Sequence, residues 1–188
     1  MKRRALFLAR DGVINIDRGY VSAPNQFEFL EDIFEVCRRA KQLDYLLFVV
    51  TNQAGIGRGY YTEREFLNLT DWMCAVFRAR GAPIDKVYYC PFHPVAGIGP
   101  YKIDSPLRKP APGMILQAAA EYQIDLPRSV LVGDKESDIR AGTAAGIGCN
   151  LLYHPCGEAS EDCRGSAAAA VIEKLAEVIP FLEFEQTP

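Results

Sequence analysis

Residues 5–12 read ALFLARDG, a run of five apolar residues that passes directly into arginine, aspartate and glycine. A short apolar run without polar alternation is typical of a strand that is buried on both faces of a parallel sheet. The same pattern predicts four further strands, at 46–51, 86–89, 130–132 and 150–153.

Longer stretches with helical spacing separate these runs and predict helices at 31–43, 62–80, 112–122, 136–145 and 167–178. Thr62 and Glu65 have the spacing of a capping box, and Gly81 and Gly146 follow the expected ends of two helices. Strands that alternate with helices indicate an α/β fold. We expect a doubly wound, mostly parallel, Rossmann-like sheet with helices on both faces.

The length, charge and cysteine content limit the possible classes of protein. The 188 residues predict a single domain over 1–188. A net charge of -3 and a pI near 5.5 disfavour a nucleic acid partner, because no basic excess is present to neutralise phosphates. Without a signal-peptide core or a long apolar run, we expect a cytoplasmic protein with no membrane partner. We also expect a monomer. Six scattered cysteines predict free thiols.

One segment interrupts the alternation of strands and helices. Residues 91–110 contain five prolines and show little periodicity. A structureless segment of about this length within a compact domain usually carries function or a local support. We therefore expect 91–110 to form a long loop near the functional site.

Polar side chains gather where the predicted strands end. Asp11 follows the first strand, Thr51 ends the second, and Asp134 follows the fourth, while Lys109 precedes the helix that leads to the fourth strand. Ligands of doubly wound sheets bind beyond the carboxyl ends of the strands. Thr51 and Lys109 could bind a phosphate there, and Asp11 and Asp134 could hold Mg²⁺.

Each of these residues also has an ordinary structural explanation. Asp-Gly is a common turn dipeptide, a threonine at a strand end often bonds a loop, and a lone lysine is usually a solvated charge. Their occurrence together, in order and each at a strand end or helix start, favours a functional site.

The residues resemble a known family. Segments 7–12, 50–53, 108–110 and 132–135 match, in order and spacing, the four motifs of the haloacid dehalogenase superfamily of phosphohydrolases. Within it the chain looks more like the heptose 1,7-bisphosphate phosphatases, which are similar to histidinol-phosphate phosphatases. The supporting stretches lie at 17–21, 51–59, 89–91 and 109–114. No sizeable insertion separates the first two motifs, so no separate cap domain is expected.

The resemblance implies hydrolysis of the 7-phosphate of a small phosphorylated sugar through an aspartyl-phosphate. By motif position Asp11 is the acid and base, Thr51 and Lys109 hold the phosphoryl oxygens, and Asp134 holds Mg²⁺ with help from Asp11. The residues that fall where the family recognises its sugar phosphate are Asp17, Arg18, Gly19, Tyr20, Asn52, Gln53, Arg58, Arg108 and Lys135.

The nucleophile position departs from the family pattern, because Ala9 stands where the first aspartate is expected. A methyl group cannot attack phosphorus, so the chain as written should be inactive. A naturally decayed, non-catalytic sugar-phosphate binder is one explanation. Asp11, Thr51, Lys109, Asp134 and Asp138 are all retained, which favours a deliberate replacement of the aspartate in an otherwise competent site.

A second departure concerns zinc. Zinc-bearing members of the family carry Cys-x-His and Cys-x-Cys in the long loop. The matching positions here are Cys90, Phe92, Ser105 and Leu107, with His93 one place late. With only one ligand in place, no structural zinc is expected.

A second substrate, histidinol phosphate, is also open. A histidinol-phosphate phosphatase would favour a pocket for a cationic amine. Arg58, Arg108 and Lys135 suit a second phosphate better, because guanidinium and ammonium groups attract anions.

Overall fold

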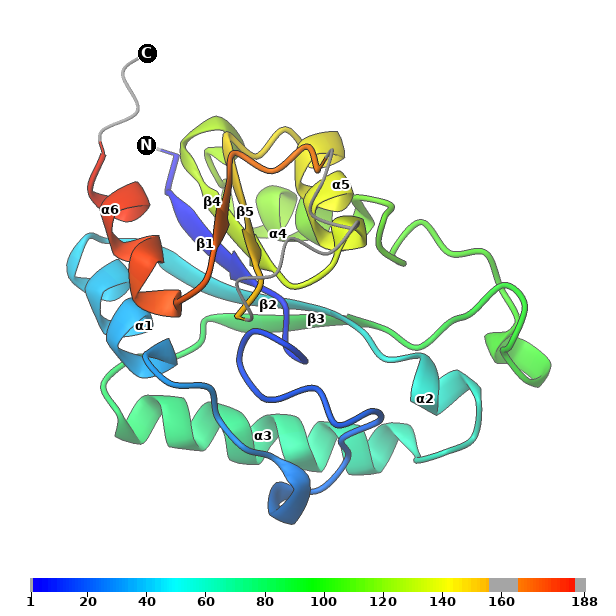
Figure 1. Ribbon diagram of the computed structural model, residues 1–188. Helices are drawn as coiled ribbons and strands as arrows, with labels where there is room; N and C mark the ends of the chain where they lie inside the picture. Colours follow the sequence, from blue (N-terminus) through cyan, green and yellow to red (C-terminus); the bar gives the residue numbers. More distant parts are fainter. Residues whose placement is uncertain (1, 156–165, 185–188) are drawn as a thin grey trace.

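The computed structural model describes residues 2–155 and 166–184, and these form one six-stranded sheet in the order β3-β2-β1-β4-β5-β6. All neighbouring strands are parallel. The strands are β1 (Ala5–Leu8), β2 (Leu46–Asn52), β3 (Lys86–Cys90), β4 (Val130–Gly133), β5 (Cys149–Tyr153) and β6 (Ala170–Ile172). The order of the strands reverses at β1, which confirms the predicted doubly wound sheet and places a topological switch between β1 and β4 (Figure 1).

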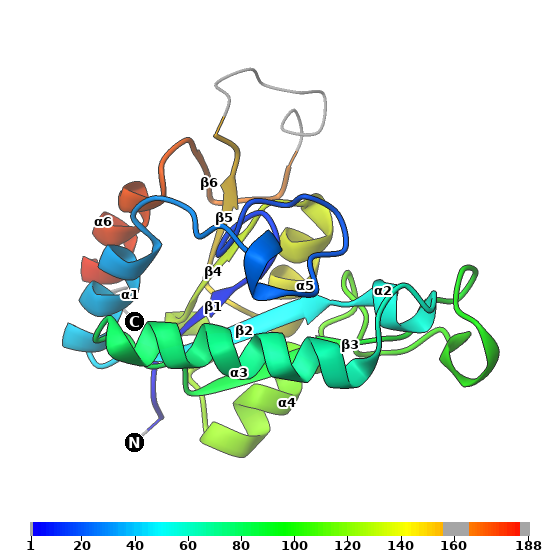
Figure 2. The same cartoon turned by 90° about the horizontal axis from the view of Figure 1, so that it is seen from below.

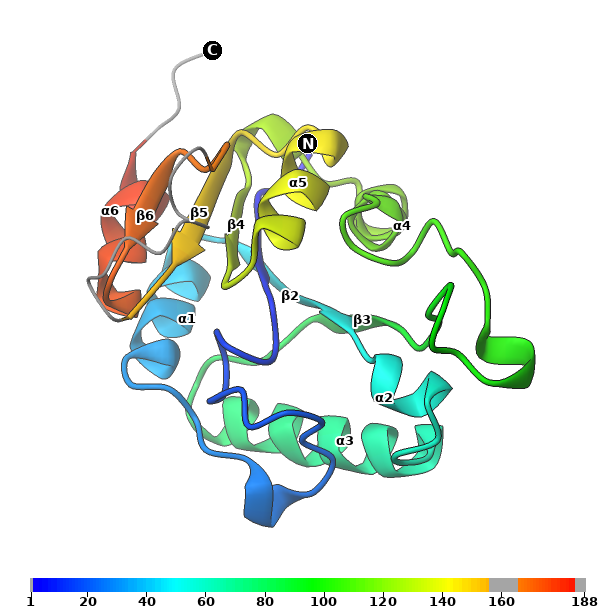
Figure 3. The ribbon, with the colours of Figure 1, turned by 45° about the vertical axis from the view of Figure 1, so that its right-hand side comes forward.

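Helices cover both faces of the sheet (Figure 3). One face carries α1 (Ile33–Gln42), α3 (Glu63–Ala79) and α6 (Val178–Glu183), and the other carries α4 (Gly113–Tyr122) and α5 (Glu136–Ala145). Alternate strand residues divide between two apolar cores. Leu6 and Leu8 face the first layer, whereas Ala5 and Phe7 face the second. The uninterrupted apolar runs of the sequence follow from this double burial.

Local signals fix the ends of the longest helix, α3, which runs along one side of the sheet (Figure 2). The Thr62 hydroxyl accepts a hydrogen bond from the Glu65 amide at 3.2 Å, and the Glu65 carboxylate accepts one from the Thr62 amide at 2.7 Å. This is the predicted capping box. Gly81, just beyond the helix, has a φ of 76°, which a residue with a side chain rarely adopts.

The predicted helix at 167–178 is wrong. Ala170–Ile172 instead forms β6, which pairs in parallel with β5, and only Val178–Glu183 forms an α-helix after a 3-10 turn at Leu175–Glu177. The His154 amide donates to the Ile172 carbonyl at 2.9 Å, and the Ala169 amide donates to the Asn150 carbonyl at 2.7 Å. Pairing with the open edge of β5 therefore overrides the helix propensity of the alanines.

Two smaller elements were not expected from the sequence. Residues Ala54–Gly57 form a short helix, α2, directly after β2. Within the long segment that follows β3, Gly99–Tyr101 forms a 3-10 turn. The Ile98 amide donates to the Gly57 carbonyl at 2.8 Å, so this segment is tied to α2 beside the carboxyl end of β2.

Four of the six cysteines lie in the described ranges. Cys37, Cys74, Cys90 and Cys149 are free thiols there. Cys156 and Cys163 lie outside the described residues. None of the helices in the described part of the chain has the length and apolar character needed to cross a bilayer.

Phe48→Ala should lower the free energy of unfolding by about 3–5 kcal/mol, because it removes a fully buried ring that packs against Phe7. Phe184 is 73% exposed, so Phe184→Ala serves as the matched control and should change the stability by less than about 0.5 kcal/mol. Urea unfolding of both variants measures the difference. Equal losses would contradict the position of Phe48 in the core.

Candidate active site

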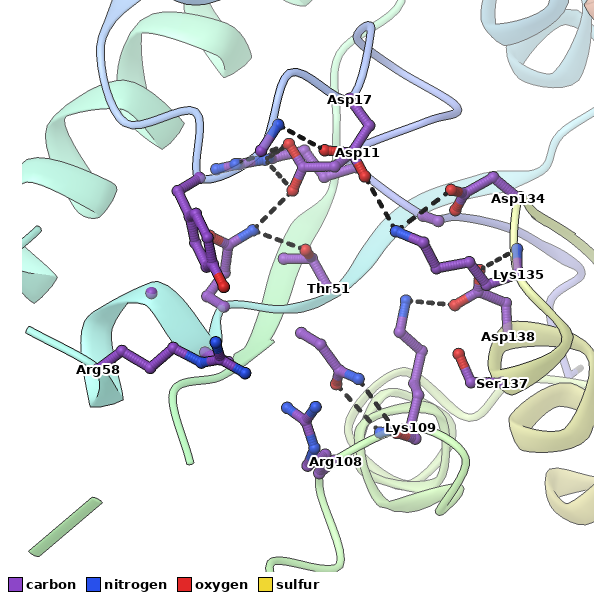
Figure 4. A pocket seen from close by; sticks show the side chains of 18 of the residues that line it. Asp11, Asp17, Thr51, Arg58, Arg108, Lys109, Asp134, Lys135, Ser137 and Asp138 are labelled. Atoms are coloured by element: carbon purple, nitrogen blue, oxygen red, sulfur yellow. Dashed lines mark hydrogen bonds and ion pairs between the residues drawn. The ribbon is translucent and has the colours of Figure 1, made fainter. Parts of the chain in front are cut away.

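A cleft of about 500 Å³ lies beyond the carboxyl ends of β1, β2 and β4. Twelve of the predicted site residues and the nucleophile position line it: Ala9, Asp11, Asp17, Gly19, Tyr20, Thr51, Asn52, Gln53, Arg58, Arg108, Lys109, Asp134 and Lys135. Arg18 is the exception, since its exposed guanidinium pairs with Glu28 outside this cleft. Figure 4 shows the labelled side chains converging from separate segments.

The strand register explains this convergence. Leu8, the last residue of β1, lies opposite Val49 of β2 and Val132 of β4. The Ala9 amide donates to the Val132 carbonyl at 3.0 Å, which holds position 9 at the base of the cleft between the two neighbouring strand ends. Ala9 is 3% exposed and Thr51 is also buried, so both belong to the floor of the cleft rather than to its rim.

Lys109 enters the floor from the loop before α4. Its ammonium group lies 2.6 Å from Asp138 Oδ1 and donates to the Val50 carbonyl at 2.8 Å. The amide of Asn52 fixes the Lys109 backbone, accepting from its N–H and donating to its carbonyl, both at 3.1 Å. Lys109 and Asp138 are both buried, so each charge depends on the other for compensation. Asn52 therefore positions Lys109 in addition to lining the cleft.

The Asp11 carboxylate is held by three side chains. Arg10 lies 2.9 Å from Oδ1, Asn15 donates to the same oxygen at 3.1 Å, and Gln53 donates to Oδ2 at 3.1 Å. Arg10 is almost fully buried and also donates to the Val21 carbonyl at 2.8 Å. Sequence reasoning missed Arg10 and Asn15 as site residues. The available signal was a polar residue directly before Asp11 and another four residues after it, next to a wholly apolar strand.

The side chain of Asp134, directly after β4, lies against the turn that follows β1. A Cβ at Gly12 would lie 2.3 Å from Asp134 Oδ2, so only glycine lets this carboxylate approach the β1 turn, where φ of Gly12 is 85°. Burial, together with the neighbouring Asp138 carboxylate, raises the pKa of Asp134 to about 6. The Lys135 ammonium lies 3.4 Å from Asp134 and 3.0 Å from Asp17, which ties the 17–20 segment to this end of the cleft.

The donor set for a metal ion is incomplete. Within residues 2–155 and 166–184, no group of three or more histidine, cysteine, aspartate or glutamate side chains is arranged to hold one. Asp134 fits a hard cation, because it is a half-buried carboxylate beside a second one, Asp138, and a cation there would offset the charge of both. Asp11 supplies the other oxygen donors nearby. The position that would add a third carboxylate is occupied by the methyl group of Ala9.

The outer part of the cleft is positively charged. The Arg58 guanidinium lies over the Tyr20 ring at 5.8 Å from its centroid, and its buried Nε has no hydrogen-bond partner among the residues that the structure describes. Arg108 donates to the Phe92 carbonyl at 3.2 Å. Figure 4 shows Arg58 and Arg108 on the same side of the cleft, away from Asp11 and Asp134. An anionic group suits this end best.

The long loop is organised by its own side chains. Cys90 is buried, and burial raises the pKa of its thiol. The Nδ1 atom of His93 accepts hydrogen bonds from the amides of Val95 and Ala96, at 3.2 and 3.0 Å. The rings of Phe92 and Tyr101 contact one another at 6.0 Å between centroids. These contacts shape the loop, and the expected absence of zinc remains a prediction.

Comparison with known proteins gives consistent results. Residues 106–178 match the HAD-hydrolase-like family model. The chain is 57% identical, over 97% of its length and 95% of the relative's, to the D-glycero-alpha-D-manno-heptose-1,7-bisphosphate 7-phosphatase of Burkholderia mallei (strain ATCC 23344). It is 45% identical to the D-glycero-beta-D-manno-heptose-1,7-bisphosphate 7-phosphatase of Vibrio cholerae serotype O1 (strain ATCC 39315 / El Tor Inaba N16961), over 92% of this chain and 91% of that one.

Solved structures show the same similarity. A HAD-like phosphatase from Mesorhizobium loti superposes with a TM-score of 0.85 and 36% identity, over 97% of this chain and 87% of that one. The D,D-heptose 1,7-bisphosphate phosphatase from B. bronchiseptica, solved with magnesium and phosphate, gives a TM-score of 0.78 and 28% identity, over 95% and 97% of the two chains.

Lys109→Met should lower the free energy of unfolding by about 3–5 kcal/mol, because it leaves the buried Asp138 carboxylate without its partner. Adding Asp138→Asn should recover much of this loss, since the uncompensated charge is then gone. Urea unfolding of the two single variants and the double variant measures the coupling. Strictly additive losses would contradict the buried ion pair.

Purified protein should contain less than about 0.1 zinc atom per chain, because Cys90 is the one soft ligand at the four positions that hold zinc in relatives of this kind. Elemental analysis after gel filtration in chelator-free buffer measures the content. One zinc per chain would show that other side chains complete a site.

Proposed function

Because the chain belongs to the heptose 1,7-bisphosphate 7-phosphatase family of HAD-like hydrolases, we propose that its cleft is built to hydrolyse the 7-phosphate of D-glycero-D-manno-heptose 1,7-bisphosphate. We further propose that Ala9 makes this chain inactive while leaving substrate binding in place. The observation that carries the proposal is the placement of Ala9, Thr51 and Lys109 together on the buried floor of the cleft.

The floor has the groups that a phosphoryl group needs. The Thr51 hydroxyl and the Lys109 ammonium, supported by Asn52, donate to phosphoryl oxygens, and charge-assisted hydrogen bonds to phosphate are strong. With aspartate at position 9, its carboxylate oxygen forms a bond to phosphorus as the bond to the sugar oxygen breaks. Asp11 donates the proton that the departing sugar oxygen takes up.

The second step regenerates the site. Water attacks the aspartyl-phosphate, Asp11 accepts the water proton, and the bond between phosphorus and the aspartate oxygen breaks to release phosphate. Asp134 and Asp11 would hold Mg²⁺, which when bound offsets the negative charge on the phosphoryl oxygens. With Ala9 the first bond cannot form, so the sequence of steps does not start.

The outer cleft supports a bisphosphate as substrate. Arg58 and Arg108 line the cleft on the side away from Asp11 and Asp134. Two guanidinium groups there favour the second phosphate of an extended sugar over the cationic amine of histidinol phosphate. The relative that is 57% identical acts, by its name, on the alpha anomer, whereas the one at 45% acts on the beta anomer. We therefore propose the alpha anomer as the preferred substrate.

The alanine at position 9 also fits a second candidate function. A chain that retains the whole cleft and lacks only the nucleophile suits a non-catalytic sugar-phosphate binder. Both functions predict binding of the same sugar phosphate. They differ in whether an aspartate at position 9 would restore hydrolysis. For either one we propose a cytoplasmic, monomeric protein whose partner is the small sugar phosphate alone.

Ala9→Asp should raise the rate of phosphate release from the bisphosphate at least about 10³-fold above that of the Ala9 chain. This activity should be lost in EDTA, which removes Mg²⁺. Ala9→Asn is the matched control, because it has nearly the same shape but a poor nucleophile, and it should stay inactive. Inorganic phosphate release measures the rates with the alpha and beta anomers and with histidinol phosphate.

The outcomes separate the candidate functions. Faster turnover of the alpha anomer supports the proposal, and faster turnover of histidinol phosphate would replace the substrate. A folded Ala9→Asp variant that binds the bisphosphate without releasing phosphate would instead establish the non-catalytic binder.

A further inference from the structure

Gln53 and Tyr61 form a buried hydrogen-bonded chain that ends on two residues of the cleft. The Tyr61 hydroxyl donates to Gln53 Oε1 at 2.5 Å. The Gln53 Nε2 group donates to Thr51 Oγ1 at 2.8 Å and to Asp11 Oδ2 at 3.1 Å. Gln53 is 1% exposed and Tyr61 7% exposed, so this chain of contacts is shielded from solvent.

We propose that Tyr61 is a positioning residue that, through Gln53, holds the Asp11 carboxyl in place to protonate the leaving sugar oxygen. The proposal rests on the proposed function and adds a residue to it. Tyr61 acts on Asp11 only through the amide between them, so it is not itself a group that exchanges a proton with the substrate.

The hydrogen-bonding capacity of an amide explains how this works. Asp11 Oδ2 has a lone pair that accepts a hydrogen bond whether or not the carboxyl carries its proton, so the Gln53 nitrogen rather than its oxygen has to face it. The Tyr61 hydroxyl then satisfies the amide oxygen on the opposite side, which stabilises this orientation over the flipped one. Both N–H groups of Gln53 are used in this orientation, one donating to Asp11 Oδ2 and the other to Thr51 Oγ1.

The same contact leaves Thr51 free to act. Its oxygen accepts from Gln53, so its own O–H remains available to donate to a phosphoryl oxygen. Loss of the Tyr61 hydroxyl would leave Gln53 Oε1 buried without that partner. An unsatisfied buried acceptor favours rotation of the amide toward another donor, and the Asp11 orientation is lost with it.

The backbone around Tyr61 is fitted to its ring. A Cβ at Gly55 would lie 2.2 Å from Tyr61 Cε1 and 2.8 Å from its hydroxyl oxygen, so the ring packs directly on the backbone of α2. Burial raises the pKa of Tyr61 to about 12, and the hydroxyl therefore remains a donor throughout the neutral range. Both features keep a protonated hydroxyl at the Gln53 oxygen.

The test uses two substrates that differ in their need for an acid. The sugar oxygen of the heptose bisphosphate requires a proton to leave, whereas p-nitrophenolate leaves without one. In an Ala9→Asp background, Tyr61→Phe should lower kcat/KM for the bisphosphate by about tenfold and that for p-nitrophenyl phosphate by less than about twofold. Because kcat/KM reports the steps up to loss of the leaving group, the later hydrolysis does not obscure the comparison.

Two further variants make the result specific. Tyr45→Phe is the matched control, because Tyr45 is a buried tyrosine far from the cleft whose hydroxyl donates to the Leu182 carbonyl, and it should leave both values unchanged. Gln53→Leu removes the contacts to both Asp11 and Thr51, so it should lower kcat/KM for the bisphosphate at least as much as Tyr61→Phe does. The double variant should lose no more than Gln53→Leu alone, since Tyr61 acts through that amide. Thermal unfolding confirms that each variant is folded.

Equal losses with the two substrates, no loss with either, or additive losses in the double variant would each overturn the positioning role. An Ala9→Asp parent that is inert toward both substrates would overturn the proposed function instead, and the role in proton donation with it. If Ala9→Asp is active and Tyr61→Phe leaves its kcat/KM unchanged, only the positioning role is overturned.

Discussion

The buried ammonium group of Lys109 is the point at which three separate parts of the chain meet. It lies against Asp138 at the start of α5 and the Val50 carbonyl of β2, while Asn52 fixes its backbone. A charge in this position is tolerated only because the surrounding groups compensate it. The same contacts hold a cation at the base of the cleft, so in the proposed function one group serves both the stability of the fold and the binding of phosphate.

Position 9 is surrounded by a cleft that is otherwise complete. Gln53 bonds both Asp11 and Thr51, and Gly12 leaves room for the Asp134 carboxylate against the turn after β1. The alanine directly after β1 keeps its bond to β4, because the backbone amide there donates to the Val132 carbonyl whatever the side chain. Under the proposed function, an alanine at this position removes the nucleophile without removing the contacts among the other cleft residues.

The strands and the position of the cleft were predictable from the sequence, because strong local patterns determine them. The apolar runs located five strands, and the polar residues after β1, β2 and β4 located the cleft, because parallel strands place their ends at one edge. The helix expected at 167–178 failed because pairing of Ile172 with β5 is a tertiary interaction that alanine content does not reveal. Arg10, Asn15 and Tyr61 were missed since each acts through a contact with Asp11 or Gln53 that only the folded backbone creates.

A crystal structure of the unaltered Ala9 chain with Mg²⁺ and the heptose 1,7-bisphosphate is the most direct measurement, because the missing nucleophile should keep the ester intact. One phosphate should lie in hydrogen-bond contact with the Thr51 hydroxyl and the Lys109 ammonium, with its phosphorus facing the Ala9 methyl group. The other phosphate should lie near Arg58 and Arg108. A bisphosphate bound elsewhere, or a cleft that stays empty at saturating ligand, would contradict this placement.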